Sequence, residues 1–88
     1  MIFTVVWLPD AERELAEIWI AATDRNRVTA AAGMIDEQLR RDPESAGESR
    51  SGGRRILIAP PLAATYRIRV DDRFVAVANV REFRPRPK

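Results

Sequence analysis

The sequence contains no cysteine and no histidine. The absence of cysteine excludes disulfide bonds and thiolate metal sites. The absence of histidine removes the most common metal ligand and the most common acid–base residue of enzymes. We therefore expect neither a metal nor another cofactor, and any catalysis has to rely on other side chains.

Long hydrophobic runs are also missing. No segment approaches the ~20 apolar residues that a membrane-spanning helix requires, and the first residues lack the basic and apolar segments of an export signal. The sequence therefore predicts a cytoplasmic protein with no membrane partner. Its 88 residues, of which 45% are hydrophobic and 32% charged, supply material for one globular domain.

Charge is distributed unevenly along the chain. Residues 1–46 carry nine acidic and five basic side chains, whereas residues 47–88 carry ten basic and four acidic ones. A cationic second half fits a phosphate-rich partner such as nucleic acid. A compositional origin is the alternative, because 14 of the 15 basic residues are arginine, as a G+C-rich genome would also produce.

The first half of the chain predicts a strand followed by two helices. Residues 2–8 are rich in β-branched and aromatic side chains, which is typical of a strand, and Pro9 suits the first turn of a helix. Apolar residues then recur at helical spacing in two stripes, which are expected to be core. The stripes consist of Ala11, Leu15, Ile18, Trp19 and Ala22, and of Val28, Ala31, Ala32, Ile35 and Leu39. Asp24 or Asn26 can cap the second helix.

The second half predicts a loop, three strands and a tail. Residues 43–53 are polar and rich in glycine, which is typical of a loop. The strands are expected at about 54–59, 62–70 and 73–80. Asp71 and Asp72 mark a tight turn between the last two strands. We predict a single domain over residues 1–80 and a basic, proline-containing tail over residues 81–88.

The predicted order is β-α-α-β-β-β, an α+β fold in which a helical hairpin packs on one face of a mostly antiparallel four-stranded sheet. Side chains alternate between the two faces along a strand. The helices are then expected to cover Tyr66, Ile68 and Val70. Arg67 and Arg69 point to the other face, so the sequence predicts an open cationic sheet face.

Segments that span nearly the whole chain share their order and spacing with a known family. Residues 5–15 form a strand-into-helix opening, and residues 35–43 form the end of a second helix. The closing strands correspond to residues 53–57, 61–62, 66–68 and 75–80. Together these segments resemble the RelE/ParE toxins. The resemblance implies the toxin of a type II toxin–antitoxin system, which binds a small antitoxin in a hetero-oligomer.

The resemblance implies one of two activities on the same fold. RelE-like members enter the ribosomal A site and cut mRNA with basic residues of the open sheet face. ParE-like members bind DNA gyrase and have no nuclease chemistry. We predict the first activity, an endoribonuclease with the ribosome and mRNA as partners, because the open face is cationic. A gyrase inhibitor, or an attenuated toxin that only binds its antitoxin and their operator, are the alternatives.

The resemblance also names candidate catalytic residues. Arg67 matches the arginine that RelE-like enzymes place beside the scissile phosphate, and Arg54 and Arg55 fall near a basic pair on the neighbouring strand. Arg81 lies near a third basic position, for which Arg84 is an alternative. Arginine matches phosphate oxygens with its planar fork. With a pKa above ~12 it is a poor acid or base, and the histidine and late tyrosine of several members are absent.

Other interpretations of the candidate residues are open at this stage. Glu48 lies near an acidic residue that acts as the base in some members of the family. Arg67 can instead be a solvated strand residue paired with Asp71 or Asp72. The basic pair on the second predicted strand can equally consist of edge-strand charges that discourage aggregation.

Overall fold

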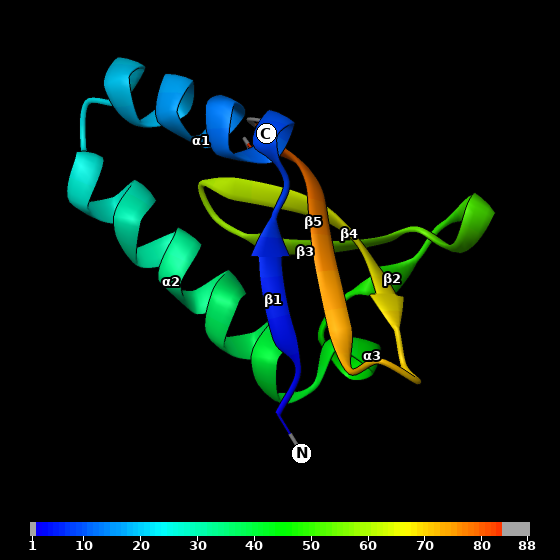
Figure 1. Cartoon of the computed structure of the whole chain (residues 1–88). Coiled ribbons are helices and arrows are strands. Elements are labelled where there is room, and N and C mark those ends of the chain that lie inside the picture. Colours follow the sequence, from blue (N-terminus) through cyan, green and yellow to red (C-terminus); the bar gives the residue numbers. More distant parts are fainter. Residues whose placement is uncertain (1, 84–88) are drawn as a thin grey trace, which may run out of the picture.

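The computed structural model describes residues 2–83. Its helices and strands are β1 (Thr4–Trp7), α1 (Pro9–Ala21), α2 (Arg25–Arg41), α3 (Pro43–Ala46), β2 (Glu48–Ser49), β3 (Arg55–Ala59), β4 (Leu62–Arg69) and β5 (Phe74–Glu82). The two long helices lie on one side of the sheet (Figure 1). Within the described part of the chain, no helix is long and apolar enough to cross a membrane.

The strands form one sheet in the order β1-β5-β4-β3-β2. The first strand pairs with β5 in parallel, and the other neighbours are antiparallel. The predicted α+β fold with a helical hairpin on a mostly antiparallel sheet is therefore confirmed. The sheet has five strands rather than the predicted four, because residues 48–49 of the predicted loop pair with residues 55–56.

The predicted boundary of the last strand is also too early. Residue Glu82 still pairs with Leu62, and the amide of Phe83 donates to the carbonyl oxygen of Pro61 at 2.7 Å. Arg81 therefore belongs to the sheet rather than to the tail. The rest of the predicted tail, residues 84–88, lies outside the described residues.

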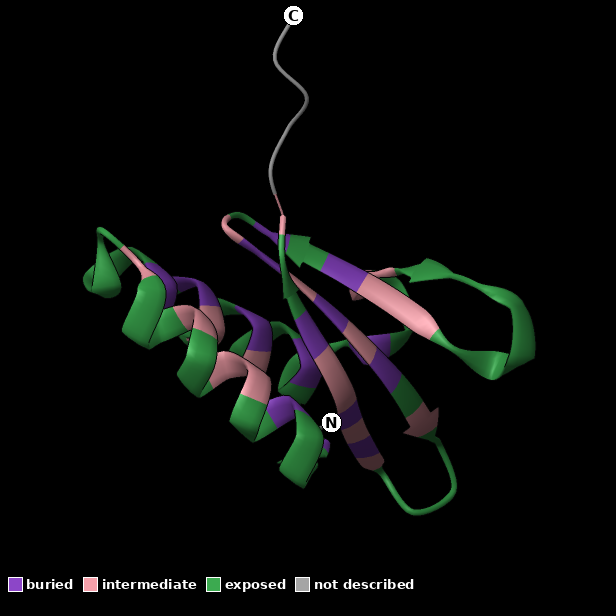
Figure 2. Ribbon diagram, turned by 90° about the horizontal axis from the view of Figure 1, so that it is seen from above, coloured by how far each residue is buried: buried purple, intermediate pink, exposed green. Residues whose placement is uncertain are grey.

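The core lies between the helices and one face of the sheet, where the buried residues gather (Figure 2). The second helix contributes Val28, Ile35 and Leu39, all at most 2% exposed. A β-bulge keeps the sheet in phase with this core, since Thr65 pairs with Asn79 but its neighbour Tyr66 pairs with Val77. The extra residue of β5 brings both Val77 and Val80, three positions apart, to the buried face.

The first helix is held to the sheet by a polar contact as well as by apolar packing. Its only fully buried residue is Ala11. The last hydrogen bond between the β1 side and β5 runs from the amide of Leu8 to the carbonyl oxygen of Val77. Past Val77, this edge of β5 has no neighbouring strand in the described structure. The carboxylate of Glu14 takes the place of such a strand, because it accepts from the amide of Val80 at 3.0 Å and from the side chain of Asn79 at 3.3 Å.

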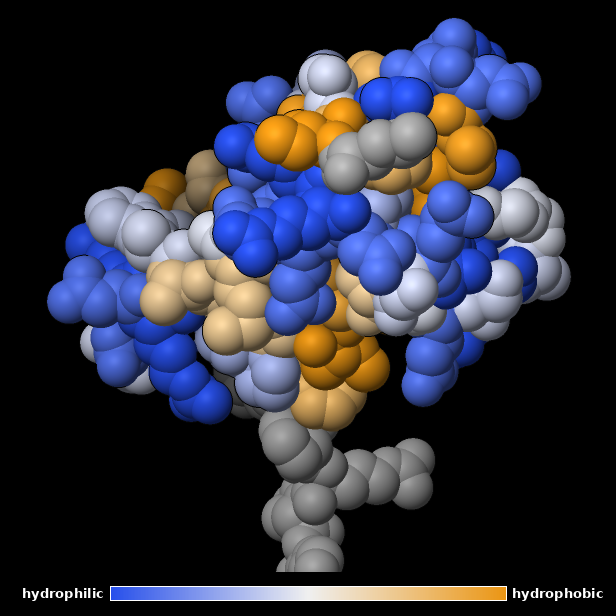
Figure 3. Space-filling view, turned by 90° about the horizontal axis from the view of Figure 1, so that it is seen from below, coloured by the Kyte–Doolittle hydropathy of each residue, from blue (hydrophilic) through white to orange (hydrophobic). Residues whose placement is uncertain are grey.

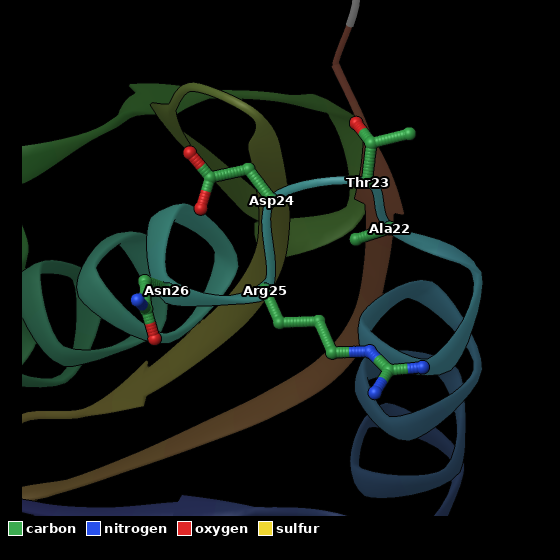
Figure 4. Close-up of a pocket in the computed structure, with 5 residues that line it drawn as sticks. All are labelled: Ala22, Thr23, Asp24, Arg25 and Asn26. Carbon is green, nitrogen blue, oxygen red and sulfur yellow. The ribbon is translucent and has the colours of Figure 1, made fainter.

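The turn between the two long helices corrects the expectation that Trp19 is core. This residue is 40% exposed, and its indole donates to the Thr29 hydroxyl at 3.1 Å. Arg25 lies 4.6 Å from the indole ring centre. It extends back toward the end of α1 (Figure 4), where it donates to the carbonyl oxygens of Trp19 and Ile20. Of the two predicted capping residues, Asp24 and Asn26, Asp24 caps α2, since it accepts from the amide of Arg27.

Two glycines offer a test of the packing. A methyl group on Gly47 would lie 2.5 Å from the carbonyl oxygen of Ile56 and 2.6 Å from the hydroxyl of Tyr66, whereas one on Gly33 meets nothing within 4 Å. We expect Gly47→Ala to lower the free energy of unfolding by about 1–3 kcal/mol through overpacking. Gly33→Ala, in the middle of α2, should raise it by about 1 kcal/mol. Urea unfolding of both variants checks this, and equal effects of one sign would contradict the packing described.

Candidate phosphate-binding site on the open sheet face

The alternation of side chains along β4 follows the predicted phase. Tyr66 is buried and Ile68 is partly buried on the helix side, while Arg67 and Arg69 are exposed. The prediction for Val70 is wrong: this residue lies past the end of β4 and is 52% exposed. The strand stops before it because the chain turns toward β5.

Two of the predicted site residues meet on the open face. Arg55 pairs with Tyr66 in the antiparallel register, so the next positions, Arg54 and Arg67, lie opposite each other. Nη1 of Arg67 donates to the carbonyl oxygen of Gly52 at 2.6 Å, and Nε of Arg54 donates to that of Ser51 at 3.2 Å. Both guanidinium groups therefore converge on the same short turn.

This turn, residues 51–53, depends on its glycines. Gly52 and Gly53 have φ angles of 74° and 75°, which side chains other than glycine rarely adopt. The amide of Arg50 donates to the carbonyl oxygen of Arg54 at 2.7 Å and closes the turn. This role of the two glycines was not predicted from the sequence, although two adjacent glycines directly before a basic pair were a signal for it.

The alternative interpretation, in which Arg67 pairs with Asp71 or Asp72, is not what the structure contains. The ion pair there joins Arg69 and Asp72 at 3.7 Å. Arg67 donates one hydrogen bond within the described residues, and a guanidinium has five N–H donors. Its remaining donors are thus available to the oxygens of a phosphate.

Arg55 lies on the other face of the sheet from Arg67. Its guanidinium donates to the carbonyl oxygens of Glu44 and Gly47, both at 2.6 Å, and at longer distances to two side-chain oxygens. One of these is the hydroxyl of Tyr66, which itself donates to the carbonyl oxygen of Pro43. The structure therefore separates the predicted basic pair: Arg55 fastens the chain between α2 and β3, and it does not join Arg54 and Arg67.

The remaining candidates lie farther along the open face. Arg81 pairs with Ala63, four residues from Arg67 on β4, which corresponds to about 13 Å along the strand. Its alternative, Arg84, lies outside the described residues. Glu48 pairs with Ile56 and so shares the face of the two arginines. Its carboxylate accepts from Arg50 at 3.2 Å.

The exposed guanidinium groups of this site suit an anionic ligand. Among residues 2–83 no group of three or more acidic, histidine or cysteine side chains lies close enough to hold a metal ion. In the space-filling view from below, hydrophilic side chains cover most of the surface, with smaller hydrophobic patches between them (Figure 3). Phosphate binding by Arg54 and Arg67 is the chemistry that this arrangement serves best.

Comparison with known proteins relates this geometry to solved structures. No family model matches the sequence, and no curated protein matches it. The RelBE2 toxin–antitoxin complex of Mycobacterium tuberculosis contains a similar chain, with a TM-score of 0.76 and 20% identity over 93% of this chain and 92% of that one. A chain of the chromosomal ParDE system of P. aeruginosa is also similar, with a TM-score of 0.66 and 18% identity over 94% of this chain and 98% of that one. The chain has the RelE/ParE fold.

The isolated RelE toxin of E. coli is also similar, with a TM-score of 0.58 and 16% identity over 96% of this chain and 87% of that one. The RelE/ParE fold explains why the helices cover only one side of the sheet. At these identities the comparison establishes the fold, and the roles of individual residues have to come from the geometry of this chain.

The contrast between the two neighbouring arginines can be tested by stability. Arg55→Met removes a guanidinium that holds the Glu44 and Gly47 carbonyls, so we expect a loss of about 2 kcal/mol in the free energy of unfolding. Arg54→Met removes an exposed side chain and should change it by less than about 0.5 kcal/mol. Thermal and urea unfolding compare the two. An equal loss in both variants would show that Arg55 has no special structural role.

Proposed function

We propose that the protein is the toxin of a type II toxin–antitoxin system, acts in the cytoplasm and cleaves mRNA on the ribosome. The observation that carries the proposal is the Arg54–Arg67 pair on the open face of a RelE/ParE fold. Paired guanidinium groups on an uncovered sheet fit a phosphodiester that is presented from outside.

The proposed reaction is attack of a ribose 2′-hydroxyl on the adjacent phosphorus. The O2′–P bond forms and the P–O5′ bond breaks, which leaves a cyclic phosphate and a free 5′-hydroxyl. Negative charge accumulates on the phosphorane oxygens, and Arg54 and Arg67 stabilise it. Arg81, about 13 Å farther along the face, binds a more distant phosphate of the same strand.

The 2′-hydroxyl needs a base, and Glu48 is the candidate. On the strands described it is the one carboxylate that shares the face of the arginine pair, since Glu82 pairs with Leu62 on the helix side. Water supplies the proton to the leaving oxygen, because arginine holds its own proton at neutral pH. The ribosome then contributes what this site lacks, the alignment of the 2′-hydroxyl with the phosphorus.

A gyrase inhibitor is the second candidate function. The fold is also that of a ParDE system, and the chain offers few proton donors for nuclease chemistry. Its only tyrosine, Tyr66, is 0% exposed, and its hydroxyl donates a hydrogen bond to the carbonyl oxygen of Pro43. A toxin that only binds its target, or an attenuated one that binds only its antitoxin, needs no such donor.

We further propose that the antitoxin binds the outer side of the helical hairpin. An apolar groove runs between α1 and α2, lined by Glu12, Leu15, Ala16, Trp19, Val28, Thr29 and Ala32. Its lining combines small side chains with the larger apolar ones of Leu15 and Trp19, which suits an amphipathic helix of a partner. The similar structures include toxin–antitoxin complexes, which supports an antitoxin as the occupant.

The nuclease proposal is tested by Arg67→Gln in a reconstituted translation reaction, with mRNA 5′ ends mapped by primer extension. We expect the unmodified protein to create new ends at the ribosomal A site, and Arg67→Gln to reduce them by at least about a hundredfold. Arg41→Gln is the matched control, because Arg41 is an exposed arginine on α2 and should cut normally. Intact mRNA with a protein that still arrests growth would contradict cleavage, and a supercoiling assay with gyrase would follow.

The antitoxin groove is tested by placing an arginine in it. Ala16→Arg should weaken binding of the cognate antitoxin, which is identified as a small protein encoded beside this one, by about tenfold or more, since it puts a charge into an apolar interface. Ala21→Arg, on the same helix but outside the groove, is the control. Calorimetric titration measures both, and equal affinities would place the antitoxin elsewhere.

A further inference from the structure

A shallow hollow lies at one end of the open face, beside the turn between β4 and β5. It is lined by Thr4, Arg69, Asp72 and Phe74. The register explains its composition, because Phe74 pairs with Thr4 on one side and with Arg69 on the other. Three adjacent strands therefore contribute one row of side chains, with an aromatic ring between a hydroxyl and a cation.

Phe74 lies on the open face of the sheet, outside the core. The neighbouring Val75 points into the core and is 0% exposed, whereas Phe74 is only partly buried. On the strands described, the other aromatic residues, Trp7 and Tyr66, lie on the helix side. An aromatic side chain beside cationic residues on an open sheet face is a binding feature of single-stranded nucleic-acid sites.

We propose that this hollow binds a base of single-stranded RNA, stacked on Phe74, beside the phosphate that Arg54 and Arg67 hold. The inference rests on the proposed function, and it adds the subsite that receives a nucleotide next to the cleaved bond. Every base has a π-face, so the subsite favours the presence of a base over its identity.

The spacing of the two subsites fits one nucleotide. Arg67 pairs with Ala76 and Arg69 pairs with Phe74, so the subsites are two residues apart, which is about 7 Å along the strand. An extended nucleotide covers a comparable length between its phosphate and the next base. Ala76, the residue between them, is small and allows the RNA to lie close to the sheet.

The charges at the rim are compatible with an incoming ligand. Arg69 and Asp72 form an ion pair at 3.7 Å, with side chains 77% and 65% exposed. Exposed pairs of this kind contribute little stability, so Arg69 can exchange its partner for the sugar–phosphate backbone or lie against the base.

The experiment measures fluorescence anisotropy of two labelled RNA probes at low salt, hexa-adenylate and a strand of the same length that lacks all bases. The unmodified protein should bind hexa-adenylate more tightly. Phe74→Leu, which keeps an apolar side chain, should weaken hexa-adenylate binding by about tenfold and leave the abasic strand unchanged. Phe74→Trp should restore the affinity, and its added tryptophan fluorescence should be quenched by hexa-adenylate but not by the abasic strand.

Failure of this inference and failure of the proposed function give different results. Arg67→Gln should weaken both probes equally, because it acts on phosphate. If Phe74→Leu binds hexa-adenylate as tightly as the unmodified protein, or loses both probes equally, the stacking subsite is wrong while the phosphate site stands. If the unmodified protein binds neither probe, both proposals fall.

Discussion

Coverage of the sheet on one side only is the constraint on which the rest of the molecule depends. The chain has two long helices, and both pack on the same face, where Val28, Ile35 and Leu39 of α2 complete the core. Because strand side chains alternate, every buried position enforces an exposed one beside it. Tyr66 is buried, so its neighbour Arg67 has to face solvent. Burial of apolar surface thus determines where the cationic residues lie.

The sequence was sufficient to predict those features of the fold that depend on local periodicity. The apolar stripe of the second helix and the phase of Arg67 follow from spacing alone, and the structure agrees with them. Of the two predicted capping residues, Asp24 and Asn26, the structure has Asp24. The short strand at residues 48–49 could not be predicted in this way. It exists only because Gly52 and Gly53 turn the chain back on itself, and its two residues carry no periodic signal.

The arginine pair shows the same limit at the candidate site. Residues 54 and 55 are chemically identical, and alternation along a strand puts them on opposite faces. Which of the two shares the face of Arg67 is decided by the register of β3 on β4. Arg55 then satisfies backbone carbonyls of the segment before it, which has no regular partner of its own. The position of Trp19 also depends on contacts that its own helix does not reveal. Arg25 and Thr29 of α2 bind its indole at the surface, so the prediction that Trp19 is core was wrong.

The parallel pairing of β1 with β5 has a consequence for how the chain folds during synthesis. The first strand must wait for residues 74–77 before it gains a neighbour, and α1 waits for the amide of Val80, which Glu14 binds. Contacts between such distant segments slow folding. Meanwhile α2, β3 and β4 can assemble among themselves, because they are contiguous. A nascent or truncated chain without β5 would therefore expose the apolar side of its N-terminal strand to chaperones and proteases.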